Sequence, residues 1–140
     1  EISTLLKNAI TNKFGEDNQN IHFANTRDTL CYATNNNQNA TLELLKNKFD
    51  IAVVVGGYNS SNTSHIVELL EEKFNTFFIE DASKIISKDT ILHFDLTAKT
   101  EIKTNNYIPT KEVLDIAITS GASCPDATVD KVMKKLISFF

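Results

Sequence analysis

The chain has 140 residues, of which 41% are apolar, and a formal net charge of −4 at pH 7. This length and apolar content suit one compact domain, and the acidic balance offers no positive field to attract nucleic acid or an anionic lipid surface. No stretch approaches the roughly 18 to 20 consecutive apolar residues that a membrane helix needs. We therefore expect a protein that binds neither nucleic acid nor membranes.

The first part of the chain is predicted to contain two helices. Apolar residues at helical spacing over residues 1–14 predict an amphipathic helix. A polar loop follows, with a short apolar element near Ile21–Phe23, and Cys31 lies at the junction after it. Thr34 can cap a second helix, whose apolar positions keep a helical period as far as Phe49.

Three strands are predicted, each from a short apolar run: Ile51–Val55, Thr76–Ile79 and Asp115–Thr119. Continuous apolar runs of this length are typical of strands that are buried on both faces of a parallel sheet. Amphipathic helices follow the first and the third run, and they extend to about Phe74 and to Phe140. Because strands alternate with helices, the sequence predicts an α/β fold with a parallel sheet flanked by helices.

Residues 88–112 interrupt this alternation. Leu92, Phe94 and Leu96 alternate with other residues, and a stretch rich in Thr, Lys and Asn then continues to Pro109. We expect a hairpin-like or flexible excursion here, and the sequence assigns it no role.

Two polar turns follow predicted strands at their carboxyl ends, where open parallel sheets bind ligands. They are Gly57–Asn62, after the first strand, and Ser120–Ser123, after the third. Each offers Ser hydroxyls and free backbone N–H groups at the start of a helix, a combination that suits a phosphate. Neither turn contains Lys or Arg, so we expect neutral donors in a buried, shaped site. The alternative is that these side chains only cap their own helices.

Other sites of known pattern are disfavoured by the residues present. Cys31 and Cys124 form no C-x-x-C pair, which excludes a self-contained zinc site and a disulfide framework. His22, His65 and His93 have no ligand-like spacing, and we expect them to be surface or packing residues. The G-x-G-x-x-G and G-x-x-x-x-G-K-[ST] fingerprints of nucleotide sites are both absent.

Three segments, in order, match the patterns D-T-[IL]-C-Y-A-T-x-x-R-Q, V-V-G-G-x-N-S-S-N-T and T-A-G-A-S-[TA]-P-D. They are Asp28–Thr34 with Gln38, Val54–Thr63 and Ile118–Asp126. These are motifs of the 4-hydroxy-3-methylbut-2-enyl diphosphate reductase (LytB/IspH) family, which the chain resembles over about residues 1–87 and 113–140. One such motif would be weak support, whereas three in register make the resemblance specific.

The resemblance implies a fold of three pseudo-symmetric α/β units around a 4Fe–4S cluster, with one Cys ligand from each unit. It makes residues 1–32 the tail of the preceding unit with the cluster-ligand loop, in which Cys31 is the metal ligand. Residues 33–140 become the C-terminal α/β unit, with an insertion near 88–112. The implied location is the bacterial cytoplasm or a plastid-type organelle.

The resemblance also implies a reaction of the non-mevalonate isoprenoid pathway. The allylic hydroxyl of 4-hydroxy-3-methylbut-2-enyl diphosphate is removed reductively to give isopentenyl and dimethylallyl diphosphates, with electrons from a ferredoxin or flavodoxin. Ser60, Ser61, Asn62 and Ser123 match the positions that hold the substrate diphosphate. These residues lie in the two turns selected above on the basis of helix dipoles.

Three positions depart from the motifs: Asn37 stands for Arg, Ser120 for Ala, and Cys124 for Thr or Ala. We do not expect Cys124 to be a cluster ligand. The family's other cluster cysteines and its catalytic Glu would precede Glu1, so we expect no catalytic residue in this chain. We also expect no cluster in it, because one thiolate cannot hold a cubane cluster. The chain alone should therefore be inactive. The alternatives are a stand-alone, flavodoxin-like phosphate-binding module and a purely structural role.

Overall fold

The computed structural model describes residues 2–16, 22 and 32–140, which divide into two compact units, residues 1–31 and 32–140. The expected assignment of residues 1–32 to a preceding unit and of residues 33–140 to a C-terminal unit stays a prediction. In the first unit, α1 (Ile2–Phe14) confirms the first predicted helix, and Gly15, with a φ of 83°, follows its last residue. Cys31 and the expected apolar element near 21–23, apart from His22, lie outside the described residues.

The second unit is built on a parallel sheet of three strands, in the order β2-β1-β5. The strands are β1 (Ile51–Val55), β2 (Thr76–Ile79) and β5 (Ile116–Ser120). Val55 pairs with Ile79 on one side and with Ser120 on the other, so the three carboxyl ends lie at one edge of the sheet. The predicted α/β class and the three predicted strands are confirmed.

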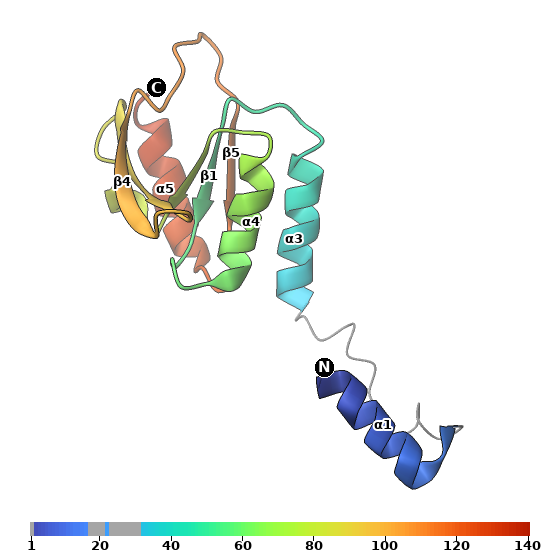
Figure 1. The fold of residues 1–140 in the computed structure, drawn as a ribbon. Coiled ribbons are helices and arrows are strands. Elements are labelled where there is room, and N and C mark those ends of the chain that lie inside the picture. Colours follow the sequence, from blue (N-terminus) through green and yellow to red (C-terminus); the bar gives the residue numbers. More distant parts are fainter. Residues whose placement is uncertain (1, 17–21, 23–31) are drawn as a thin grey trace. The chain divides into compact units, whose positions relative to one another are not determined.

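Helices cover both faces of this sheet (Figure 1). They are α3 (Tyr32–Leu44), α4 (Ser61–Glu71) and α5 (Asp126–Ile137). Every residue of β1 is fully buried, and its side chains alternate between two core clusters. Ile51 and Val53 pack in the cluster that contains Val132 of α5, whereas Val54 packs in the cluster that contains Ile66 of α4. The continuous apolar run of β1 is therefore explained by burial on both faces.

The excursion at residues 88–112 is a β-hairpin. It consists of β3 (Thr90–Asp95) and β4 (Thr100–Asn105), which pair antiparallel, and it follows a short 3₁₀ helix, η3 (Ala82–Lys84). Ile91 of β3 packs in the core cluster that contains Val132, and Phe94 packs against the cluster that contains Ile66. The hairpin is thus packed into the second unit. Of the two forms that the sequence left open for residues 88–112, the hairpin is correct and the flexible excursion is not.

Some helix limits differ from the prediction. Helix α3 begins at Tyr32, so Thr34 lies inside it, and the expected cap at Thr34 is wrong. The helix ends at Leu44 rather than Phe49, and the ammonium of Lys73 donates to the carbonyl oxygens of Leu45 and Asn47 just beyond that end. The last carbonyl groups of a helix have no hydrogen-bond partner within the helix. The Lys73 ammonium supplies a donor to carbonyl groups at this point, which stabilises the chain where the helix ends.

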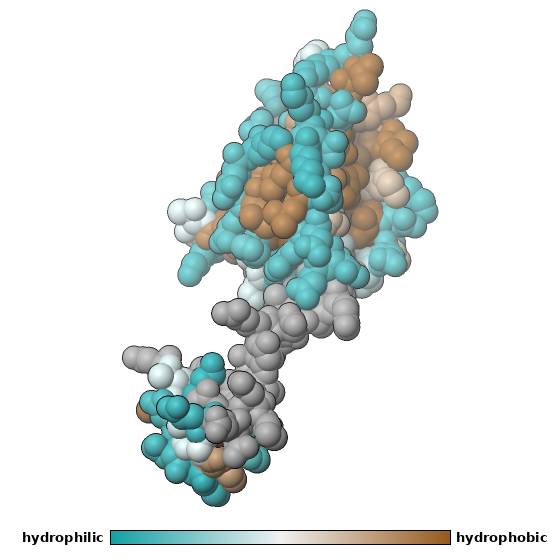
Figure 2. All heavy atoms as spheres, turned by 90° about the vertical axis from the view of Figure 1, so that its right-hand side faces the viewer, coloured by the Kyte–Doolittle hydropathy of each residue, from teal (hydrophilic) through white to brown (hydrophobic). Residues whose placement is uncertain are grey.

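The surface of the second unit carries several exposed apolar side chains. The large ones are Leu42, Ile86, Ile102, Val113, Met133, Ile137 and Phe140. In the view of Figure 2, apolar surface gathers in patches that are bordered by hydrophilic side chains. In the part of the chain that the structure describes, no helix has both the length and the apolar character required to cross a membrane.

Candidate functional site

The two polar turns selected from the sequence lie side by side at the carboxyl edge of the sheet. The first connects β1 to α4, and the second connects β5 to α5. The backbone N–H of Gly121 donates to the carbonyl oxygen of Val55 at 3.1 Å, and that of Gly56 donates to Ile79 at 3.0 Å. Both bonds continue the sheet pairing by one residue, and the bond of Gly121 brings the start of the second turn beside the start of the first.

Thr63, in the first turn of α4, fills the space between the two turns. A Cβ atom built on Gly121 would lie 2.0 Å from the Thr63 Oγ1, and one built on Gly56 would lie 3.0 Å from the same side chain. Thr63 is fully buried. Both glycines are therefore required by this close approach, and not by an unusual backbone angle.

Ser60 and Ser61 differ in what their hydroxyls do. Ser60 is the N-cap of α4, and its Oγ accepts a hydrogen bond from the Thr63 N–H at 3.3 Å. Capping of this kind satisfies one of the free N–H groups of the first turn. Ser61, the first residue of the helix, is exposed. The capping interpretation is thus correct for Ser60, whose hydroxyl can still donate to a ligand because a hydroxyl both donates and accepts.

Asn62 and Thr63 hold polar atoms that are buried without a hydrogen-bond partner among the described residues. They are both amide atoms of Asn62, Nδ2 and Oδ1, and the Oγ1 of Thr63. An unpaired buried polar group costs about 1–3 kcal/mol, so such groups in a folded protein need an explanation. A bound ligand that supplies an acceptor for Nδ2 would remove part of this cost.

The second turn presents free backbone donors beside this cluster. Pro125 is the N-cap of α5, and no side chain caps that helix. Ser123 is exposed, and Cys124 is half-buried with its N–H donating to the carbonyl oxygen of Gly121 at 2.9 Å. The start of α5 therefore keeps first-turn N–H groups available to an anion. Burial, followed by the charge of Asp126, raises the pKa of the Cys124 thiol, which favours the neutral form.

Three features of this edge were missed by the sequence reasoning. One is the packing of Thr63 between the glycines, and another is a hydrogen bond from Asn37 of α3 to the carbonyl oxygen of Ser120. The third is the hydrogen bond from Tyr58, in the first turn, to Glu101 of β4. Tyr58 and Thr63 lie within the second matched motif, and Asn37 departs from the first, so the motifs were the available signal for these three positions.

The described residues do not form a site for an iron–sulfur cluster. Among residues 2–16, 22 and 32–140, no group of three His, Cys, Asp or Glu side chains could hold a metal ion. Cys31, the expected ligand, lies outside them, and Cys124 is the single cysteine that they include. A cubane cluster needs three or four thiolates, so its remaining ligands would have to come from other residues.

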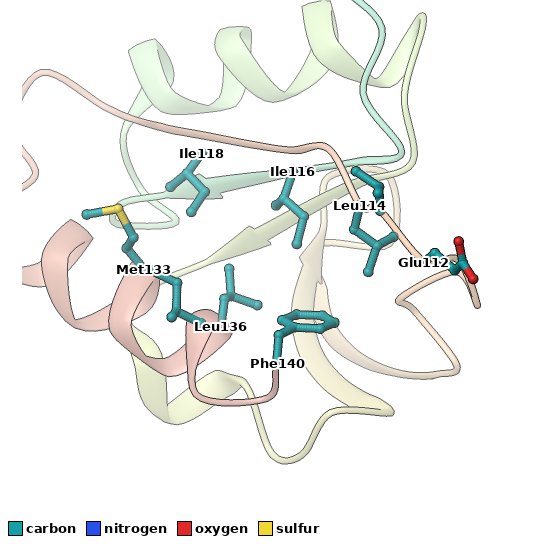
Figure 3. A pocket seen from close by; sticks show the side chains of 9 residues that line it. Glu112, Leu114, Ile116, Ile118, Met133, Leu136 and Phe140 are labelled. Atoms are coloured by element: carbon teal, nitrogen blue, oxygen red, sulfur yellow. The ribbon is translucent and has the colours of Figure 1, made fainter.

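A separate groove of about 520 Å³ lies between β5 and α5 and differs in chemistry from the two turns. Figure 3 shows Ile116 and Ile118 of β5 facing Leu136 and Phe140, with the carboxylate of Glu112 at the rim and directed away from them. An apolar lining offers a phosphate no donors, and burial of charge against it is costly. The groove is therefore unsuited to an anion.

Comparisons with known proteins point to one family. The model of the LytB protein family matches residues 3–137. A 4-hydroxy-3-methylbut-2-enyl diphosphate reductase from Gloeobacter violaceus is 37% identical over 136 residues, which cover 96% of this chain and 32% of that protein. A protein of the same name from Prochlorococcus marinus strain MIT 9301 is 38% identical over 139 residues, covering 98% of this chain and 34% of that protein.

A solved structure supports the fold. The structure of an (E)-4-hydroxy-3-methyl-but-2-enyl diphosphate reductase matches with a TM-score of 0.56 and 24% sequence identity, and the match covers 79% of this chain and 32% of that chain. At this identity the likeness establishes the arrangement of helices and strands. The chain thus spans about a third of the length of the curated relatives and of the solved structure that it matches.

Proposed function

The chain belongs to the LytB protein family, and on this basis we propose that it forms the C-terminal part of a 4-hydroxy-3-methylbut-2-enyl diphosphate reductase. Two curated proteins of that name match over nearly all of this chain and about a third of their own length. The complete protein would convert its substrate to isopentenyl and dimethylallyl diphosphates in the non-mevalonate pathway. Its location would be the bacterial cytoplasm or a plastid-type organelle.

The role proposed for residues 33–140 is to hold the substrate diphosphate. The observation that carries this role is the unpaired, buried amide of Asn62 at the start of α4. The donors available to a diphosphate here are all neutral: the Nδ2 of Asn62, the hydroxyls of Ser60, Ser61 and Ser123, and the N–H groups at the starts of two helices. Charge-assisted hydrogen bonds from such donors to phosphate oxygens, strengthened by two helix dipoles, favour a dianionic or trianionic group without any Lys or Arg.

The proposed division of labour leaves the redox chemistry to residues outside those described. Loss of the allylic hydroxyl as water requires two electrons and two protons, and an iron–sulfur cluster with Cys31 as one ligand would transfer the electrons from a ferredoxin or flavodoxin. The two turns would fix the diphosphate end, so that the hydroxyl end reaches the same place in each turnover. By itself this chain would then be inactive.

Asn62→Ala in the complete protein tests the diphosphate site. Removal of a buried amide that has no partner should leave the free energy of unfolding unchanged or raise it, because no hydrogen bond is lost. The same change should raise KM for the diphosphate substrate roughly 10- to 150-fold, since a hydrogen bond to a charged group contributes about 1.5–3 kcal/mol. An unchanged KM would show that Asn62 does not bind the substrate.

Two further measurements separate the reductase from the stand-alone module. In the complete protein, Cys31→Ser should abolish the iron–sulfur absorption, and its retention would contradict the proposed ligand. Calorimetric titration of the 140-residue chain with inorganic pyrophosphate should give weak or no binding if the site needs the rest of the protein. Tight binding by this chain alone would favour an independent phosphate-binding module, for which the compact unit at residues 32–140 would suffice.

A further inference from the structure

The β3–β4 hairpin lies beside the candidate site as well as beside the sheet. Its strands span Thr90–Asp95 and Thr100–Asn105, and β3 packs next to β2, at the edge of the sheet opposite β5. Two of its residues, Phe94 and Glu101, contact Tyr58 of the first turn. The turn that leads to the N-cap of α4 is thus in contact with a segment more than 35 residues away.

The first contact is an aromatic cluster. The ring of Tyr58 stacks on Phe94 of β3 with centroids 4.5 Å apart and planes 18° apart, and it meets the edge of Phe78 of β2 at 5.1 Å. Pairs of this geometry contribute about 0.5–1.5 kcal/mol beyond the area they bury. The side chain of Tyr58 is therefore fixed on two sides by residues of two strands.

The second contact is polar. The Tyr58 hydroxyl donates to the Oε1 of Glu101 at 2.7 Å, and the ammonium of Lys84 forms an ion pair with the same oxygen. The side chains of Lys84 and Glu101 are 21% and 31% exposed, so both are largely sheltered from water. The Lys84 hydrogen bond, and then that of Tyr58, lower the pKa of Glu101. Glu101 is therefore ionised near neutral pH and accepts both bonds.

We propose that the β3–β4 hairpin positions the first diphosphate-binding turn through Tyr58, with Glu101 as the acceptor that holds the tyrosine in place. The inference rests on the proposed function of that turn. Tyr58 lies two residues before the N-cap Ser60 and four before Asn62, and within the turn the Ser60 N–H donates to the carbonyl oxygen of Gly57 at 3.0 Å. A turn held in its binding conformation loses less conformational entropy when the ligand binds.

Amide hydrogen exchange measures this role without any ligand. In Tyr58→Phe and Glu101→Ala, exchange of the N–H groups over residues 59–63 should become faster than in the unaltered chain, while exchange in β1 should not change. Lys103→Ala is the matched control, because Lys103 is exposed on the same strand as Glu101 and two residues from it. Unchanged exchange over residues 59–63 in both variants would overturn the proposal.

Kinetics of the complete protein give the second readout. Tyr58→Phe keeps the stacked ring and loses only the hydrogen bond, so the chain should fold, whereas KM for the diphosphate substrate should rise roughly 2- to 10-fold with kcat little changed. Glu101→Gln keeps an acceptor for Tyr58 and should restore most of what Glu101→Ala loses. Lys103→Ala should match the unaltered protein in both constants.

The two proposals can fail separately. If Asn62→Ala, Ser60→Ala and Ser61→Ala all leave KM unchanged, the turn does not bind the diphosphate, and the proposed function of the turn fails. If Asn62→Ala raises KM but Tyr58→Phe and Glu101→Ala do not, the turn binds the substrate without help from the hairpin, and only the positioning role fails. A KM that rises in all three variants and not in Lys103→Ala supports both.

Discussion

The Nδ2 of Asn37 donates a hydrogen bond to the main-chain carbonyl oxygen of Ser120 at 3.0 Å. This bond connects α3 to the carboxyl end of β5 across 83 residues of sequence. Both positions depart from the family motifs, in which they are Arg and Ala. The contact uses only the backbone of Ser120, so Ala there would preserve the acceptor, and Arg in place of Asn37 would still carry donors.

Substitution of Asn37 should therefore depend on whether a donor remains. Asn37→Asp replaces the donor with a carboxylate that faces the Ser120 carbonyl oxygen, and it should lower the free energy of unfolding by about 1–3 kcal/mol. Asn37→Arg keeps donors and should change it by less than about 0.5 kcal/mol. Urea unfolding of the two variants measures the difference. Equal stability of the two would show that the bond contributes nothing.

Most of the fold could be predicted from the sequence because its signals are local. The run Ile51–Val55 is buried on both faces, as a continuous apolar strand should be. The alternation of Leu92, Phe94 and Leu96 left a hairpin-like and a flexible excursion open, and β3 and β4 pair in a hairpin. The cap expected at Thr34 failed because the helix signal was read from its apolar positions, which begin later than the helix itself.

The details of the candidate site could be predicted only in part, because they depend on contacts between distant residues. Capping by Ser60 is local and was weighed from the sequence. The packing of Thr63 against Gly121, however, joins residues on two different turns, and the bond from Tyr58 to Glu101 spans 43 residues. Periodicity carries no information on such pairs. The roles of Ser60, Ser61, Asn62 and Ser123 as ligands of a diphosphate remain predictions.

Gly121→Ala tests the close packing of the two turns. The added methyl would lie 2.0 Å from the Thr63 Oγ1, so the turns must move apart, at a cost of about 1–3 kcal/mol in unfolding free energy. Thr63→Ala removes that oxygen, and the double variant should recover part of the loss, which a double-mutant cycle measures. Gly57→Ala is the control, because nothing lies within 4 Å of a Cβ there and its stability should be nearly unchanged.

Ser60 and Ser61 allow capping to be separated from binding. Ser60→Ala removes the N-cap of α4 and should lower the free energy of unfolding by about 1 kcal/mol. Ser61→Ala removes an exposed hydroxyl and should change it by less than about 0.5 kcal/mol. If both hydroxyls bind the diphosphate, each variant should raise KM in the complete protein roughly 2- to 10-fold. A change in stability at Ser60 without any change in KM would leave capping as its sole role.

The ion pair of Glu101 predicts a specific dependence of stability on pH. Hydrogen bonds from Lys84 and Tyr58 lower the pKa of Glu101 below its ordinary value of 4.5. A carboxyl group whose pKa is lower in the folded state stabilises the protein above its unfolded pKa, and this stabilisation is lost as the pH falls through the folded pKa. The contribution should be modest, because the side chain is 31% exposed.

Glu101→Gln removes this titration while it keeps an acceptor for Tyr58. The free energy of unfolding should be higher for the unaltered chain than for Glu101→Gln near pH 7, and the difference should shrink as the pH falls from about 4.5 through the lowered pKa of Glu101. Asp50 and Asp81 also have lowered pKa values, so both proteins lose stability in acid, and only the difference between them isolates Glu101. Urea unfolding at constant salt between about pH 7 and pH 3 gives this difference. A difference that stays constant over the whole range would show that the charge of Glu101 gains nothing from Lys84 in the folded state.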